Sequence, residues 1–246
     1  MNILSDRILS LEESQTIAMA RQSRELIERG VDVISLSLGE PDFDTPDFIK
    51  DAAKKAIDDN FSHYTPVPGL GELRTALSKK FKRDNKLTYA ADEIVVSTGA
   101  KQSLAQLMLA LVNPGDEVIV PAPYWVSYFQ MVKMAEGIPV VIEATVEADF
   151  KITPKQVEKA ITSKTKAFLF STPCNPTGSV YSRKELAELV SVFEQHPNLI
   201  IISDEIYEHI SFLGEHVSIG QFESIKDRVV TVNGVSKGFA MTGWRV

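Results

Sequence analysis

Apolar and polar positions along this chain alternate between two patterns. Short apolar runs, such as Leu199–Ser203, predict buried strands, and longer segments with apolar positions three or four residues apart predict helices. The predicted strands are Val31–Leu38, Glu93–Ser97, Glu117–Pro121, Pro139–Glu143, Lys166–Ser171, Leu199–Ser203 and Arg228–Asn233. The predicted helices are Ser14–Gly30, with Ser14 as its cap, Asp47–Asp58, Leu70–Arg83, Lys101–Leu111, Trp125–Ala135 and Arg183–Gln195.

This alternation predicts an α/β fold. Strands separated by helices of about ten or more residues form crossover units, which build a mainly parallel sheet with helices on both faces. The loop Gly39–Pro46 contains two prolines that interrupt regular structure, so we place a domain boundary near residue 45. Ligands of open α/β sheets bind beyond the carboxyl ends of the strands, so the residues after each strand are the candidates for chemistry.

Composition narrows the class of protein. The chain has 246 residues, 44% of them hydrophobic, and a net charge of -7, which argues against nucleic acid or an anionic membrane as partner. One cysteine, Cys174, excludes an internal disulfide framework and a multi-cysteine metal site, and we expect no metal. No signal peptide and no membrane span is predicted, so we expect a cytoplasmic protein.

The last residues of the chain, Gly243–Val246, fall within what the pattern predicts as a strand. Domains rarely end inside a strand, because the open backbone groups need partners. We therefore expect the sequence to be a piece of a longer protein.

Two of the predicted strand ends have features that suit a flat, phosphorylated ligand. The strand Glu93–Ser97 precedes Gly99 and Ala100 at the start of a helix, where free amide groups can hold phosphate, although such a turn also occurs without a ligand. Trp125 follows the strand Glu117–Pro121, where it would stack on an aromatic ring or simply cap the core.

The next two strand ends supply polar side chains. Asn175, in a rigid loop after Lys166–Ser171, can bond a ligand or only shape the turn. Asp204 follows a buried strand and needs a cationic partner, such as a protonated pyridine nitrogen, unless it caps the next helix. Tyr207, three residues later, would face the same place.

The last predicted strand precedes Lys237. A lysine after a buried strand loses hydration, which favours the neutral amine that attacks an aldehyde. Arg245 could bind phosphate in a bidentate manner. Each residue alone has an ordinary explanation, and most lysines are solvated surface charges, but together they are the parts that a pyridoxal-phosphate (PLP) site needs.

The chain resembles the class I and II aminotransferases of PLP fold type I, most closely their aspartate aminotransferase branch. The resemblance covers essentially the whole chain and includes several specific motifs in order. These are Gly39-Glu40-Pro41-Asp42-Phe43, Tyr64-Thr65-Pro66, Thr98-Gly99-Ala100-Lys101-Gln102, Asn175-Pro176-Thr177-Gly178, Ser203-Asp204-Glu205-Ile206-Tyr207 and Ser236-Lys237 through Gly243-Trp244-Arg245.

The resemblance implies a seven-stranded-type sheet, with residues 1–45 as an N-terminal arm and part of a small domain, and residues 46–246 as an incomplete PLP-binding large domain. It implies that Lys237 forms the Schiff base and moves the substrate proton, while Asp204 pairs with the pyridine nitrogen. The cofactor contacts that it implies are Tyr207 and Asn175 at the phenolic oxygen, Trp125 on the ring, and Gly99, Ala100, Lys101, Ser236 and Arg245 around the phosphate. Tyr64 would reach the neighbouring subunit's phosphate, which implies a homodimer with shared sites.

The substrates implied are an amino acid and a 2-oxo acid, specifically aspartate and 2-oxoglutarate. Gly39 and Asn175 would touch the α-carboxylate, beside Trp125, and Lys101 would meet the distal carboxylate unless it is only a helix-start charge. Two departures stand out. Gly234 replaces a hydroxyl residue found in many relatives, and no arginine here matches the one that clamps the substrate α-carboxylate, so this piece alone is expected to be inactive.

Competing functions remain. A C–S β-lyase, a decarboxylase or a cyclopropane-forming synthase would use the same core with a different reaction. A ligand-sensing domain of a transcription regulator would need a DNA-binding domain, which the first 45 residues do not predict. A dinucleotide-binding enzyme would need a Gly-x-Gly-x-x-Gly motif after its first strand, and Gly69 and Gly71 do not fit that motif. We also expect a cis bond between Asn175 and Pro176.

Overall fold

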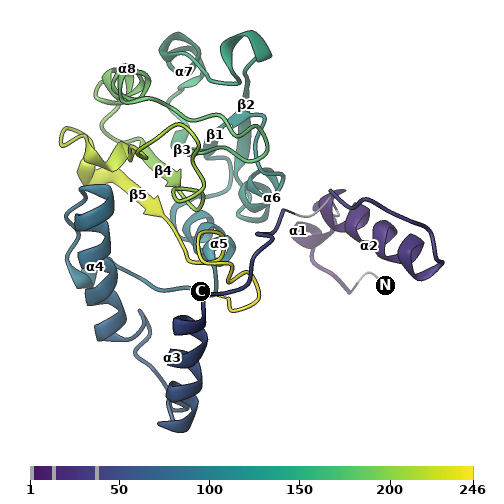
Figure 1. The fold of residues 1–246 in the computed structure, drawn as a ribbon. Coiled ribbons are helices and arrows are strands. Elements are labelled where there is room, and N and C mark those ends of the chain that lie inside the picture. Colours follow the sequence, from purple (N-terminus) through teal and green to yellow (C-terminus); the bar gives the residue numbers. More distant parts are fainter. Residues whose placement is uncertain (1–2, 13–14, 37–38, 246) are drawn as a thin grey trace.

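A parallel sheet lies at the centre of the fold (Figure 1). The computed structural model describes residues 3–12, 15–36 and 39–245. Within them, one five-stranded sheet has the order β2-β1-β3-β4-β5. The strands are β1 (Glu117–Ala122), β2 (Ile138–Glu143), β3 (Thr165–Ser171), β4 (Ile200–Asp204) and β5 (Val229–Val232).

Helices of very different length connect and flank these strands. The α-helices are α1 (Asp6–Leu9), α2 (Gln15–Glu28), α3 (Asp47–Asp58), α4 (Gly71–Asn85), α5 (Ala100–Leu111), α6 (Ser127–Met134), α7 (Pro154–Ala160) and α8 (Arg183–Phe193). Short 3-10 turns are η1 (Ala91–Glu93), η2 (Val146–Ala148), η3 (Ile219–Gln221) and η4 (Lys226–Arg228). Among the described residues, no helix combines the length and apolar character that crossing a bilayer requires.

The sheet is buried on both faces, as the apolar runs predict. Along β3, Ala167 and Leu169 pack on one face with residues of α5 and α6, and Phe168 and Phe170 pack on the other with residues of α7 and α8. Successive side chains of a strand point to opposite faces, so a strand buried on both sides needs a continuous apolar run. Figure 1 shows the two helical layers on either side of the sheet.

The predicted α/β class and parallel sheet are confirmed, and most predicted elements agree with the structure to within one or two residues. The predicted strand Glu93–Ser97 is wrong. Glu93 ends a 3-10 turn, and the amide of Val96 donates to the carbonyl of Pro68, in a loop, rather than to a neighbouring strand. The described residues therefore contribute five strands to the sheet, where the resemblance implies seven.

The predicted strand Val31–Leu38 is also wrong over residues 31–36, which are mostly exposed and form no ladder. The strand predicted at Gly243–Val246 is wrong as well over residues 243–245, because residues 242–244 form a turn. Ser37, Leu38 and the predicted cap Ser14 lie outside the described residues. The short helix α7 was not predicted, although Thr153 and Gln156 form a capping box before it. A helix of seven residues is too short to show a clear apolar periodicity in the sequence, so its capping box alone is easily missed.

The N-terminal segment lies beside the sheet rather than in it. Figure 1 shows α1 and α2 to the right of the sheet, α4 at its lower left and α3 below it. Lys133 of α6 donates to the carbonyl of Ser10 at 2.6 Å, which ties α1 to α6. Residues 39–45 then pass close to the chain beyond β5, where Thr45 donates to the carbonyl of Ala240 at 2.6 Å.

Candidate active site

The parallel register brings three chain segments to one edge of the sheet. Ser171 of β3 pairs with Asp204 of β4, and Asp204 pairs with Val232 of β5. The loops that leave these strands therefore begin at the same level. They carry Asn175, Asp204 and Lys237, which the sequence places at strand ends.

Asp204 is buried at the end of β4. Tyr128 donates a hydrogen bond of 2.6 Å to its Oδ2, and the amide of Ile206 donates one of 3.2 Å to its Oδ1. Burial raises the pKa of Asp204 from its ordinary 3.8 to about 6, the two hydrogen bonds lower it, and the neighbouring charge of Glu205 raises it. A carboxyl group in this state gains from a cationic partner, because a nearby positive charge stabilises its ionised form.

Tyr128 is a residue of the site that the sequence reasoning missed. Its side chain is 1% exposed, and its ring meets that of Trp125 edge-on, with 5.5 Å between centroids. Burial raises its pKa well above the ordinary value, and Asp204 adds to that effect, so Tyr128 acts as a hydrogen-bond donor. It lies three residues after Trp125, and this helical spacing was the signal that could have identified it.

Asn175 and Tyr207 meet beside Asp204. Nδ2 of Asn175 donates to the hydroxyl of Tyr207 at 3.2 Å. Burial raises the pKa of Tyr207, and the charge of Asp204 raises it further, so the phenol keeps its proton. The predicted cis bond between Asn175 and Pro176 is confirmed.

Lys237 lies over the ring of Tyr207, with 5.9 Å between Nζ and the ring centroid. Its Nζ donates a hydrogen bond to the carbonyl of Gly39. Burial lowers the pKa of Lys237, and the charge of Glu40 partly opposes this. Tyr207 is therefore near both groups: its ring centroid lies 5.9 Å from Nζ of Lys237, and the charge of Asp204 acts on its phenol.

A basic turn lies at the start of α5. Gly99, with φ of +80°, is the N-cap of this helix, and a Cβ added to it would clash with Nη2 of Arg245. Arg245 also donates to the carbonyl of Thr242 at 2.6 Å and to that of Thr98 at 3.4 Å. The guanidinium therefore packs against the glycine at the N-terminus of a 12-residue helix, where Ala100 is the first residue. Helix N-termini with an adjacent arginine bind anions.

Lys101 follows in the same turn. Its Nζ lies 4.8 Å from the centroid of the Trp125 ring. Burial lowers the pKa of Lys101, and the positive charge of Arg245 lowers it further. Trp125 also packs against the core cluster under α5 and α6, as expected of a core residue. Its contact with Lys101 leaves the interpretation as a site residue open as well.

The three remaining predicted site residues have different environments. Ser236 is buried, and its carbonyl accepts from the amide of Met241 at 3.0 Å. Gly39 meets Lys237 through its carbonyl. Tyr64 is fully exposed, with a relative exposure of 107%, so its side chain contacts none of the residues above.

Comparisons with known proteins show which proteins this chain is similar to. A sequence profile of the family described as aminotransferase class I and II matches residues 31–246. An aspartate/prephenate aminotransferase of Cereibacter sphaeroides is 51% identical over 248 residues, covering 100% of this chain and 62% of that protein. An aspartate aminotransferase of Bacillus sp. strain YM-2 is 48% identical over 246 residues, covering 99% of this chain and 62% of that protein.

Solved structures agree with the sequence comparisons. An aspartate aminotransferase from Thermus thermophilus with maleate superposes with a TM-score of 0.96 at 44% identity, covering 100% of this chain and 63% of that one. The aspartate aminotransferase from Rhizobium meliloti gives a TM-score of 0.95 at 42% identity, covering 100% and 62%. The chain thus spans about 62% of the length of the curated relatives described above.

Proposed function

Since this chain belongs to the class I and II aminotransferase family, we propose that the whole protein is a PLP-dependent aminotransferase. Its substrates are aspartate, or a related dicarboxylic amino acid, and 2-oxoglutarate. The observation that carries the proposal is the grouping of Lys237, Tyr207 and Asp204 at adjoining strand ends, with an amine of lowered pKa and a buried carboxyl group of raised pKa. The names of the relatives support the substrate class.

The donor set suits PLP chemically. The cofactor has an aldehyde that requires an amine, a ring nitrogen that requires an acid, a phenolic oxygen that accepts hydrogen bonds and a phosphate that requires cations and amides. Lys237 supplies the amine and Asp204 the acid. Asn175 and Tyr207 supply hydrogen-bond donors, and Trp125 supplies an aromatic face. The phosphate group is assigned to the turn at the start of α5 and the residues near it, which are Gly99, Ala100, Lys101, Ser236 and Arg245.

The roles of the chain's own residues follow from their environments. When bound, PLP supplies an electron-withdrawing ring that stabilises negative charge on the substrate Cα. Asp204, held by Tyr128, keeps a negative charge where a protonated ring nitrogen would lie. Lys237, with its lowered pKa, would take the proton from the substrate Cα and pass it to C4′ of the bound cofactor, rather than back to Cα, so that the amino group stays with the cofactor.

Substrate recognition is assigned to Lys101 and Gly39. Lys101 is a half-buried cation beside Trp125, suited to the distal carboxylate of aspartate. Gly39 and Asn175 are assigned to the α-carboxylate. The aspartate/prephenate names of several relatives favour prephenate as a second amino acceptor, which also bears two carboxylates.

We assign residues 1–45 to an arm and part of a small domain, and residues 46–246 to the cofactor-binding domain. The exposed apolar side chains of α2, among them Ile17, Met19 and Ile27, support an arm that packs against another surface. A homodimer with shared sites would supply that surface, and it would also use the exposed Tyr64 at the partner's phosphate site.

Absorbance of the intact protein with PLP tests the proposal. We expect a band near the edge of the visible range, which disappears when aspartate is added and returns with 2-oxoglutarate. Lys237→Ala should lack the band, whereas the matched control Lys86→Ala, which removes an exposed lysine paired with Glu215, should keep it. A band that persists in Lys237→Ala would mean that another amine holds the cofactor. Release of pyruvate and ammonia without a 2-oxo acid would indicate a lyase instead.

A further inference from the structure

The segment after β4 alternates site residues with buried carboxylates. Asp204 and Tyr207 belong to the site described above, whereas Glu205 and Glu208 bond to other parts of the structure. Glu205 is 0% exposed and Glu208 is 8% exposed. Burying a carboxylate is unfavourable unless hydrogen bonds or opposite charges compensate for the lost hydration. The partners of Glu205 and Glu208 therefore show which parts of the structure each carboxylate holds together.

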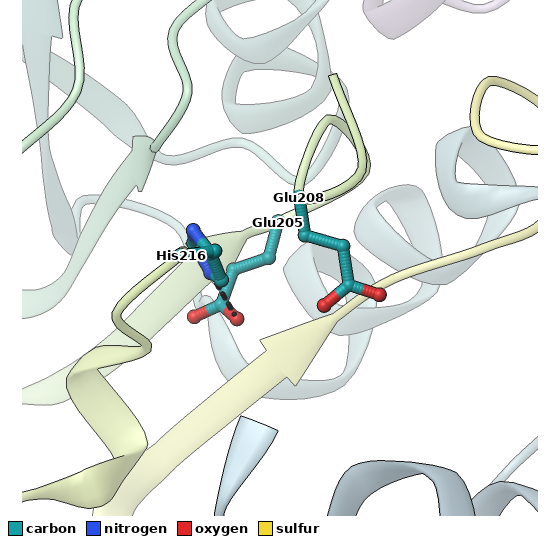
Figure 2. A group of neighbouring side chains, drawn as sticks. All are labelled: Glu205, Glu208 and His216. Atoms are coloured by element: carbon teal, nitrogen blue, oxygen red, sulfur yellow. Dashed lines mark hydrogen bonds and ion pairs between the residues drawn. The ribbon is translucent and has the colours of Figure 1, made fainter. Parts of the chain in front are cut away.

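Glu205 ties the segment to the residues just before η3 and to β4 itself. Its Oε1 accepts from Ser203 at 2.9 Å and from Ser218 at 2.7 Å. Its Oε2 lies 2.9 Å from Nε2 of His216, a contact drawn in Figure 2. The amide of Glu205 donates to the carbonyl of Val232 at 2.8 Å, which continues the pairing of β4 with β5.

Glu208 ties the same segment to α4. Its Oε1 pairs with Nζ of Lys80 and lies 3.1 Å from Nε2 of His209, and its Oε2 accepts from Nδ2 of Asn85. Lys80 also donates to Oδ1 of Asn85 at 2.7 Å, which closes a ring of three side chains. The pairing lowers the pKa of Glu208 against the effect of burial, so this carboxylate stays ionised.

Glu205, Glu208 and His216 place potential metal ligands within 4.8 Å of one another (Figure 2). Each of the four carboxylate oxygens already has a hydrogen-bonding or ionic partner. The ammonium group of Lys80 touches Glu208, and a divalent cation in this place would meet its repulsion. The carboxylate oxygens of the cluster are therefore already engaged, and only Nδ1 of His216 lacks a hydrogen-bond partner within the described part of the cluster. This arrangement is a hydrogen-bond network rather than a vacant coordination site.

We propose that Glu205 and Glu208 are positioning residues, which fix Asp204 and Tyr207 against the cofactor by anchoring the segment between them on two sides. This inference rests on the proposed function, because it concerns how the site meets PLP. Rotation of the segment would break contacts with the residues around η3 on one side and with α4 on the other. Glu208 holds the hydroxyl of Tyr207 within reach of Asn175, whose Nδ2 lies 3.2 Å from it.

The two anchors act on different groups. Glu208 adjoins Tyr207 in the chain, so its loss releases the phenol. Glu205 adjoins Asp204 and its negative charge raises the pKa of that carboxyl group, so Glu205→Gln also lowers the pKa of Asp204. Both effects change the environment of a bound cofactor without removing a group that touches it.

The test compares Glu205→Gln and Glu208→Gln with Glu117→Gln in the intact protein. Glu117 is a matched control, because its carboxylate accepts from Thr162 at 2.6 Å and Thr165 at 3.2 Å at the opposite end of the sheet. The measurements are the affinity for PLP, the pH midpoint at which the absorbance of bound PLP changes, and the melting temperature of the protein without PLP. We expect the two anchor variants to bind PLP about tenfold more weakly and to shift the midpoint by about half a pH unit or more.

A double variant separates positioning from folding. In Lys80→Met/Glu208→Met the ion pair is replaced by apolar side chains, which often restores stability. We expect its melting temperature to approach that of the wild type, while the midpoint remains shifted. Two results would overturn the positioning role. One is a pH midpoint equal to that of the wild type in both the double variant and Glu205→Gln. The other is a midpoint shift in these variants that is no larger than the shift in Glu117→Gln. Failure of the wild type itself to bind PLP would overturn the proposed function together with this inference.

Discussion

Tyr128 donates a hydrogen bond of 2.6 Å to Asp204, and the two side chains are 1% and 4% exposed. The pair joins α6 to the end of β4. The hydroxyl lowers the pKa of a carboxyl group that burial raises. Catalysis that depends on ionised Asp204 therefore depends on Tyr128 as well.

Tyr128→Phe should raise the pKa of Asp204 above about 6, because the variant loses a donor that stabilises the carboxylate. The acid limb of the profile of kcat/KM against pH should move to higher pH by about half a unit to one unit, the value of one strong hydrogen bond. Tyr181→Phe is the control, since Tyr181 is a buried tyrosine that accepts from the amide of Ile152 at 3.0 Å instead. Equal profiles for the two variants would contradict the assignment.

Asp204→Asn should stabilise the protein without PLP while removing activity. The folded pKa of Asp204 is raised, so its stabilising contribution is present below the unfolded pKa of 3.8 and is lost as pH rises through about 6. Above pH 6 the ionised group costs on the order of 3 kcal/mol, and asparagine avoids that cost. We expect Asp204→Asn to melt at a higher temperature than the wild type at pH 8 and at a similar temperature at pH 4.

Activity of the same variant should fall about 100-fold or more, as when a group that stabilises developing charge is removed. Full activity would contradict the role of Asp204 at the cofactor. A stability difference that does not change with pH would show that Asp204 does not ionise at a cost in the folded protein.

Lys101→Gln should raise the KM for aspartate by about 10- to 100-fold, because a charged hydrogen bond contributes about 1.5–3 kcal/mol. The kinetic constants for alanine, which lacks a distal carboxylate, should change much less. Steady-state kinetics with both amino acids measures the difference. An equal effect on both would assign Lys101 to the cofactor turn alone.

Gly99→Ala should weaken PLP binding by about tenfold or more, since its Cβ would clash with the Arg245 guanidinium. Gly115→Ala is a matched control. Gly115 has a φ of +87°, close to the +80° of Gly99, but a Cβ there would meet nothing within 4 Å. Both variants should lose about 1 kcal/mol of stability through backbone strain, and only Gly99→Ala should lose cofactor affinity. Equal PLP affinities would show that the Gly99–Arg245 contact does not serve the phosphate.

The sequence predicts the sheet well, because β3 and β4 are continuous apolar runs that only a doubly covered strand explains. It fails at Glu93–Ser97, because an extended apolar segment can bond to a loop as well as to a strand, and composition does not distinguish the two. Val31–Leu36 fails for the same reason, since strand propensity depends on a neighbour that the sequence does not identify.

Within the site, Asp204, Asn175, Tyr207 and Lys237 could be found because each follows a strand, and parallel strands end at one edge. Tyr128 could not be found in this way, because it lies on a helix and its partner is 76 residues away. Glu205 and Glu208 resemble ordinary surface acids in the sequence. Only their distant partners, His216 and Lys80, show that they are buried.

Ser171, Asp204 and Val232 are register partners in neighbouring strands. The position of Asp204 along β4 therefore decides which side of the sheet its carboxyl group faces. Ile202 and Asp204 are two residues apart on the side of α5 and α6, and Ile201 belongs to the opposite core. Inserting or deleting a single residue within β4 would turn the acid toward the α7 and α8 layer, leaving Tyr128 opposite a different side chain. Length variation in this protein should therefore be tolerated in its surface loops and rejected inside this strand.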